Sequence, residues 1–174
     1  MLITLILLSA GLSLYYGIFA TMRPVSIWRS IAKTGAILCL AFIALLQGGP
    51  VLLVAALGLS ALGDYFLSRE TDATFLAGMA AFFAAHLAYI PLFLALGVSD
   101  LIPVRWVPAA ALVIFAGAFY TYLWPGLGAF RLPVAAYSLA IASMGVSALG
   151  LATNGAQALI LAGAGLFVVS DSIL

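Results

Sequence analysis

The sequence predicts an all-α fold, a polytopic bundle of transmembrane helices that forms a single domain over residues 1–174. The first observation is composition: 67% of the residues are hydrophobic, only 6% are charged, and the mean hydropathy is +1.31. Soluble domains carry about 25% charged residues, so this chain cannot cover itself with a water-compatible surface. The second is that long apolar stretches recur along the whole chain, and helices satisfy the backbone of such stretches inside a bilayer.

Seven spans are expected, because a helix needs about 20 residues to cross a hydrocarbon core of about 30 Å. The first stretch lacks a basic leader and exceeds the usual signal-peptide core, so we interpret it as a retained span. The last stretch stops at Leu174 without a polar tail, so an eighth span is expected to be missing from this sequence. The predicted spans lie near residues 2–21, 31–46, 51–67, 73–96, 104–122, 132–149 and 156–174.

Breaker residues fill the predicted connectors. Proline, glycine and charged residues punctuate local structure, so they favour loops between the spans. They occur in Arg23-Pro24, Gln47-Gly48-Gly49-Pro50, Arg69-Glu70-Thr71-Asp72, Asp100 to Pro103, Trp124-Pro125-Gly126 and Thr153-Asn154-Gly155.

The basic residues predict the orientation, since cytoplasmic loops carry an excess of Lys and Arg. With the N-terminus outside, the outer side receives only Arg105. The inner side then receives Arg23, Arg29, Lys33, Arg69 and Arg131. We therefore expect a multi-pass protein of the bacterial cytoplasmic (inner) membrane with its N-terminus outside.

The same composition argues against several partners and cofactors. The basic residues form no run, so a nucleic-acid partner is not expected. Cys39 is the only cysteine and His86 the only histidine, which argues against a disulfide and a zinc site. We expect no metal and no cofactor.

Two of the five carboxylates lie inside apolar stretches. Glu70, Asp72 and Asp100 fall in predicted loops, whereas Asp64 and Asp171 fall in the third and seventh spans. A charged carboxylate deep in a span costs at least about 2.5–3.5 kcal/mol, so such residues usually face a cavity and mark function.

The depths of these two aspartates agree. At about 1.5 Å per residue, Asp64 lies about 20 Å from the outer end of its span and Asp171 about 22 Å. Both helices run from outside to inside, so the two carboxyl groups are predicted to face each other across a cavity near the inner surface. The alternatives are that each caps a helix end or bonds a neighbouring helix.

Other polar residues are candidates for supporting roles. Ser60 precedes Asp64 by one turn and therefore shares its helical face. Tyr137 in the sixth span lies at a similar inner depth, where its hydroxyl could bond a carboxylate. His86 and Tyr89 lie one turn apart in the fourth span, about 10 Å away in depth, and a buried histidine there is often a core residue.

Small residues and one proline shape the predicted bundle. Pro91 is expected to kink the fourth span and to free a carbonyl near Leu87. Glycines let helices approach closely, and they recur in the spans at Gly58, Gly63, Gly78, Gly163 and Gly165.

Taken in order, these residues resemble the YhhN-like lysoplasmalogenase family of membrane proteins. The similarity covers the third to seventh spans, although members of that family typically have eight spans. It rests on Ser60-Ala61-Leu62-Gly63-Asp64, on Phe75, Gly78, Phe82, His86 and Tyr89, on Tyr137 and Met144, and on the segment from Phe167 to Ser172.

The resemblance implies hydrolysis of the vinyl ether bond of lysoplasmalogens to a fatty aldehyde and a glycerophospho-alcohol. The substrate would be a lysophospholipid taken from among the membrane lipids, with Arg69 or Arg131 near its phosphate. Asp64 and Asp171 would be catalytic. The supporting residues would be Ser60, His86, Tyr89, Tyr137 and Ser170.

The chemistry of vinyl ethers agrees with a pair of carboxyl groups. Their acid hydrolysis begins with slow protonation of the distal alkene carbon, which gives an oxocarbenium ion that captures water. An enzyme for this step needs one carboxylic acid that keeps its proton and a second, negative group for the cation. Low dielectric surroundings and a neighbouring carboxylate favour such a neutral acid.

Two other functions also use membrane carboxylates. A proton-coupled transporter would expose them alternately to both sides, but the broken helices typical of such sites are not evident. An intramembrane aspartyl protease would need glycine at Ala61, and its Tyr-Asp element is replaced here by Ser170-Asp171.

Overall fold

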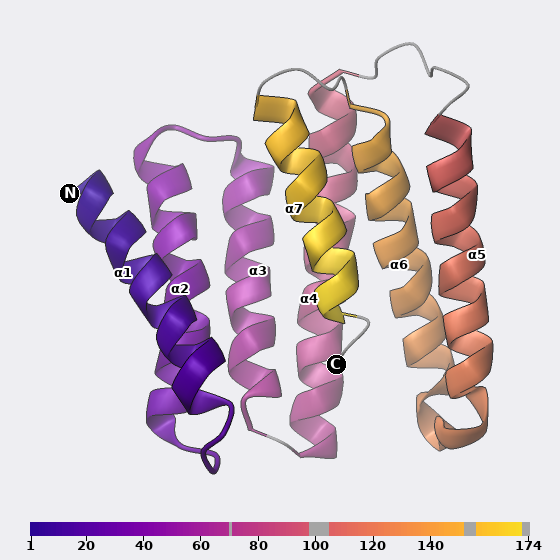
Figure 1. Cartoon of the computed structure of the whole chain (residues 1–174), viewed down its shortest axis with the longest axis horizontal. Helices are drawn as coiled ribbons and strands as arrows, with labels where there is room; N and C mark the ends of the chain where they lie inside the picture. Colours follow the sequence, from indigo (N-terminus) through magenta and orange to yellow (C-terminus); the bar gives the residue numbers. More distant parts are fainter. Residues whose placement is uncertain (70, 98–104, 152–155, 172–174) are drawn as a thin grey trace. The chain divides into compact units, whose positions relative to one another are not determined.

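A computed structural model of the chain describes residues 1–69, 71–97, 105–151 and 156–171 (Figure 1). These ranges contain helices and no strands, which confirms the all-α prediction. They divide into two compact units, Met1–Ala88 and Tyr89–Leu174, so the single domain stays a prediction. Three parts of the predicted connectors, Glu70, 98–103 and 152–155, lie outside the described residues. So do Val104, the predicted start of the fifth span, and the end of the last span, 172–174.

Within the described residues, five helical segments are long and apolar enough to cross a membrane, which agrees with the predicted helical membrane bundle. Two further apolar helices, Val51–Leu67 and Ala158–Asp171, are shorter, so the count of seven spans stays a prediction. The five long segments are Leu2–Ala20, Ile27–Leu46, Asp72–Ala95, Trp106–Gly126 and Gly128–Leu149.

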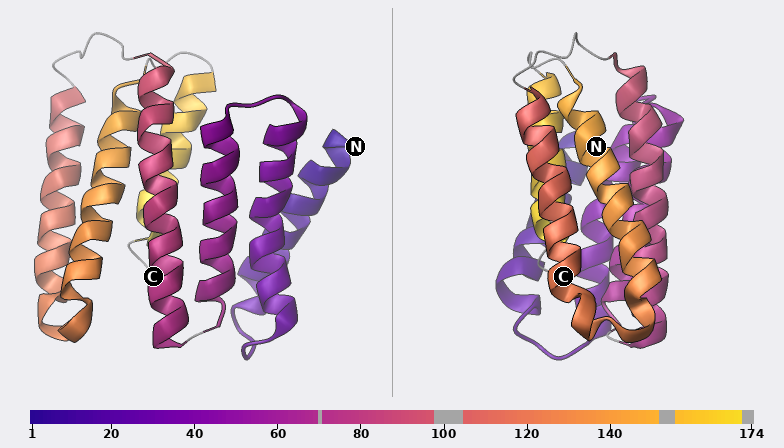
Figure 2. Two further views of the ribbon diagram at one scale, coloured as in Figure 1. Left: turned by 180° about the vertical axis from the view of Figure 1, so that it is seen from behind. Right: turned by 90° about the vertical axis from the view of Figure 1, so that its right-hand side faces the viewer.

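The first unit is built from neighbouring helices joined by short connectors. Helix α2 packs against both α1 and α3; α2 and α3 run side by side in Figures 1 and 2, whereas α1 is tilted across α2. Ser9 on α1 donates a hydrogen bond of 2.8 Å to the carbonyl of Ala36 on α2. The elements are α1 (Leu2–Tyr15), a π-helical turn (Tyr16–Ala20), α2 (Ile27–Leu46), α3 (Val51–Leu67) and the first part of α4 (Asp72–Ala95).

Helix α2 begins four residues earlier than the predicted span 31–46. The backbone N–H of Arg29 donates to the Ser26 hydroxyl at 3.3 Å, so Ser26 caps the helix. Ser30 is buried, and its hydroxyl lies 2.7 Å from that of Ser68. The predicted start was wrong because hydropathy treats this polar turn as a loop, whereas the turn is helical and partly buried.

Close packing of α3 on α4 depends on two glycines. A Cβ atom at Gly63 would lie 2.5 Å from the ring of Phe82, and one at Gly78 would lie 2.8 Å from Cγ of Leu67. The predicted packing role is therefore confirmed for these two glycines. At Gly58 a Cβ atom would meet no other atom of the described chain within 4 Å, and the same holds at Gly163 and Gly165.

The second unit centres on α6, which packs against both α5 and α7. A Cβ atom at Gly145 of α6 would lie 2.5 Å from Cδ2 of Leu112 on α5. Helix α4 continues through Pro91 to Ala95, so the proline does not end the helix. The other helices of the unit are α5 (Trp106–Leu123), two 3₁₀ turns (Trp124–Gly126 and Gly128–Phe130), α6 (Arg131–Leu149) and α7 (Ala156–Asp171).

Arg105, which the sequence offered only as a topology signal, closes the end of α6. Its side chain is buried, and Nη1 donates to the carbonyl oxygens of Leu149 at 3.2 Å and Leu151 at 2.6 Å. The last carbonyls of a helix have no partner within the helix, so an arginine there satisfies groups that would otherwise be unpaired.

Replacing Arg105 by Met should destabilise the protein by about 1–3 kcal/mol, because it removes charged donors from buried carbonyls. Thermal unfolding in detergent measures the effect. Arg23→Met removes the same charge from an exposed residue and should leave the unfolding temperature close to that of the wild type. Equal unfolding temperatures for the two variants would contradict the capping role.

Candidate functional site

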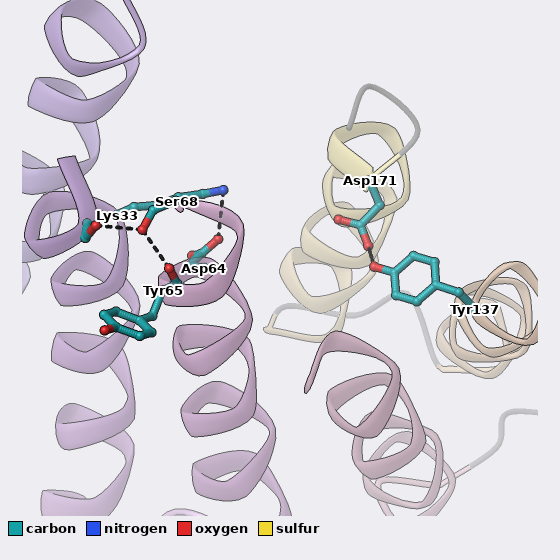
Figure 3. Close-up of polar contacts among 7 residues, drawn as sticks. Lys33, Asp64, Tyr65, Ser68, Tyr137 and Asp171 are labelled. Atoms are coloured by element: carbon teal, nitrogen blue, oxygen red, sulfur yellow. Dashed lines mark hydrogen bonds and ion pairs between the residues drawn. The ribbon is translucent and has the colours of Figure 1, made fainter. Parts of the chain in front are cut away.

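Asp64 lies near the C-terminal end of α3, where its carboxylate forms an ion pair with a lysine of α2. The Asp64 Oδ1 atom is 3.3 Å from Lys33 Nζ, and the two side chains are 14% and 15% exposed (Figure 3). A charge inside an apolar segment is costly when it stands alone, and an opposite charge within contact distance reduces that cost. The third-span carboxylate therefore has a cationic partner within its own unit.

Lys33 is the site residue that the sequence pattern did not single out, because it stood there only as a basic residue of the inner side. Its Nζ atom also lies 5.5 Å from the ring centroid of Tyr16, a cation–π contact. A signal for the pair was present: Lys33 lies fifteen residues before Gly48 and Asp64 fifteen residues after Gly49. In an antiparallel helix pair with its turn at these glycines, the two residues lie at the same level.

The turn of α3 that follows Asp64 fixes this helix against α2. The hydroxyl groups of Ser68 and Ser30 are 2.7 Å apart, and the Ser68 hydroxyl donates to the Tyr65 carbonyl at 2.6 Å (Figure 3). Arg69 donates from Nη2 to the Tyr65 hydroxyl at 3.2 Å, and its guanidinium lies 4.8 Å from the centre of that ring. The Lys33–Asp64 pair therefore sits beside a hydrogen-bonded helix contact.

Ser60 lies one turn before Asp64 on α3, as its spacing predicted. Its side chain is buried, and its hydroxyl makes no hydrogen bond within the described chain. The structure places Ser60 in the core of the first unit and does not join it to Asp64 by a hydrogen bond.

Asp171 lies at the described end of α7, where it meets the neighbouring helix α6. The hydroxyl group of Tyr137 donates a hydrogen bond to Asp171 Oδ2 (Figure 3). Both side chains are half-buried, whereas Ser170 beside them is exposed. The structure thus brings together the tyrosine and the aspartate for which the sequence predicted a similar depth.

His86 is a core residue of the first unit and is fully buried. Its Nδ1 atom lies 2.6 Å from the Phe82 carbonyl oxygen in the same helix. A carbonyl only accepts hydrogen bonds, so Nδ1 carries the proton in this contact. The ring of Phe82 covers Gly63, so the residue that His86 contacts lies at the α3–α4 contact beside Asp64.

Tyr89 belongs to the second unit, where it contacts two aromatic rings. Its ring centroid lies 5.6 Å from that of Phe93 and 6.5 Å from that of Phe167 on α7. Phe167 precedes Asp171 by one helical turn, so Tyr89 packs against the helix that carries the second aspartate.

The two aspartates have chemically different partners. Asp64 contacts an ammonium group within the first unit, whereas Asp171 contacts a phenolic hydroxyl within the second. Two carboxyl groups in different environments can hold different protonation states, as a general acid and a base require. That the two act together stays a prediction.

Comparison with known proteins places the chain in a family. No curated protein and no solved structure matches it. The profile of the YhhN family matches residues 28–174, which include all but the first residue of α2, both aspartates and their partners Lys33 and Tyr137. The chain belongs to the YhhN family.

Proposed function

We propose that this protein is a lysoplasmalogenase-like hydrolase, which cleaves the vinyl ether bond of alkenyl glycerophosphocholine or glycerophosphoethanolamine with water. Membership of the YhhN family over most of the chain supports the proposal. The main support for this function is the pair of aspartates, Asp64 and Asp171, within apolar helices. Both aspartates lie in the segments whose sequence resembles the lysoplasmalogenases.

The proposed reaction needs one acid and one base and returns both to their starting state. The acid gives its proton to the alkene carbon distal to the ether oxygen, which leaves an oxocarbenium ion. Water adds to the cationic carbon as the base removes a proton, so a hemiacetal forms. The base then protonates the ether oxygen while the acid recovers the hydroxyl proton, and the C–O bond breaks to give aldehyde and alcohol.

The surroundings fit a substrate that arrives within the membrane. Many large hydrophobic side chains are exposed, above all on α5. Such exposure is expected for helices that face lipid acyl chains. We propose that the lysolipid lies along such a surface with its phosphate near Arg69 or Arg131. Arg131 lies 4.5 Å from the ring centroid of Trp124, so each of these guanidinium groups is held beside an aromatic ring.

The experiment that tests the proposal is release of fatty aldehyde by the detergent-purified protein. Lysoplasmalogen should yield aldehyde and glycerophospho-alcohol in equal amounts, and a matched lysolipid with a saturated ether should yield neither. Absence of aldehyde would overturn the proposal. Proton-dependent solute uptake by sealed vesicles, without hydrolysis, would favour a transporter instead.

Tyr137→Phe should lower the rate of aldehyde release by about 10–100-fold, because a hydrogen bond to a charged group is worth about 1.5–3 kcal/mol. The matched control is Tyr120→Phe, since the Tyr120 hydroxyl donates to the Arg131 carbonyl at 3.2 Å and not to a carboxylate. Initial rates and unfolding temperatures of both variants check the prediction. Equal losses of rate in the two variants would argue against a specific role for Tyr137.

A further inference from the structure

We propose that Lys33 is the positioning residue for Asp64, and that this ion pair holds Asp64 as the ionised base of the proposed reaction. The inference rests on the proposed function and deepens it, because that function alone does not say which group is the base.

Lys33 is held in place from two sides. Its ammonium lies 3.3 Å from Asp64 Oδ1 and 5.5 Å from the ring centroid of Tyr16. Tyr16 opens the π-helical turn Tyr16–Ala20, and such turns are frequent at functional sites. One turn away the Ser30 and Ser68 hydroxyls join α2 to α3, so the register of lysine and aspartate is fixed.

The ammonium partner of Asp64 favours the carboxylate over the carboxylic acid. An ammonium offers three donors and no acceptor, so it bonds an ionised carboxylate but cannot accept a carboxyl proton. An ionised carboxylate has about four acceptor positions on its two oxygens, so a water can bond it beside the lysine. Asp64 is therefore suited to stabilise the oxocarbenium ion and to take a proton from water.

A stability cycle tests the ion pair without any assay of activity. Lys33→Met and Asp64→Asn should each lower the unfolding temperature in detergent, because each leaves one charge without its partner in an apolar segment. The double variant should lose less stability than the sum of the two single losses. Additive losses would overturn the ion pair.

Kinetics test the positioning role. Lys33→Met should lower kcat at least about 10-fold and leave KM within about twofold, because a residue that acts through Asp64 stabilises the transition state rather than the bound lysolipid. Lys33→Arg should restore most of kcat, while Arg23→Met should match the wild type. A rise in KM at unchanged kcat, or a Lys33→Met enzyme with wild-type kinetics, would overturn the role.

Rescue by a small anion tests the assignment of Asp64 as the base. Formate is ionised at neutral pH and can replace a missing base, so it should partly restore aldehyde release to Asp64→Ala but not to Asp171→Ala. The opposite pattern would overturn the assignment. If the wild type releases no aldehyde, the proposed function fails and the catalytic role of Lys33 with it, while the stability cycle still decides the ion pair.

Discussion

Asp64→Asn and Asp171→Asn should each lower the rate of aldehyde release by at least about 10²–10⁴-fold, the range that a positioned acid or base contributes. The amide has nearly the same size as the carboxyl group but neither gives nor takes a proton at neutral pH. A dyad that protonates a carbon and activates a water needs both groups, so neither single variant should retain useful activity. Initial rates with saturating lysoplasmalogen measure the loss.

The control is Asp72→Asn, which changes an exposed carboxylate at the start of α4 and should keep wild-type activity. Asp64→Asn also leaves Lys33 without its carboxylate, so loss of folding must be separated from loss of catalysis. The double variant Lys33→Met/Asp64→Asn removes both charges and should be folded yet inactive. Aldehyde release by a folded form of either single variant would contradict the shared mechanism.

Hydropathy alone was enough to predict the helices, because a membrane-embedded backbone leaves few alternatives to the helix. Most predicted spans begin or end within two residues of the corresponding helix, and α3 matches its prediction, Val51–Leu67. The predicted start of α2 was wrong because Arg29, Ser30 and Lys33 lower the local hydropathy. Such polar residues can belong to a buried helical turn when a residue on another helix bonds them, as Ser68 bonds Ser30.

A contact in the candidate site could be predicted from the sequence only where two residues were expected at the same depth in the membrane. Tyr137 and Asp171 were expected at a similar level, and a hydrogen bond joins them. Lys33 was missed because its role depends on the register between α2 and α3, which counting along single spans ignores. His86 is a different case, because the Phe82 carbonyl that its ring contacts lies one turn earlier in the same helix.

Gly63→Ala should destabilise the protein by about 1–3 kcal/mol, because one added methyl group overlaps a buried aromatic ring. The new Cβ would lie 2.5–3.0 Å from three ring atoms of Phe82, closer than packed atoms tolerate. Moving that ring would also shift the backbone carbonyl bonded to His86 and the turn that carries Asp64. The variant should therefore lose aldehyde release together with thermal stability.

Two other glycines make the matched controls. Gly58→Ala on the same helix meets no atom of the described chain within 4 Å, so it should be neutral or stabilising by up to about 1 kcal/mol through helix propensity. Gly145→Ala should fall between the two, because its Cβ would meet the flexible end of Leu112 rather than a ring. Equal unfolding temperatures for Gly63→Ala and Gly58→Ala would contradict the prediction. Close packing of α3 on α4 at Gly63 would then not be needed to position Asp64.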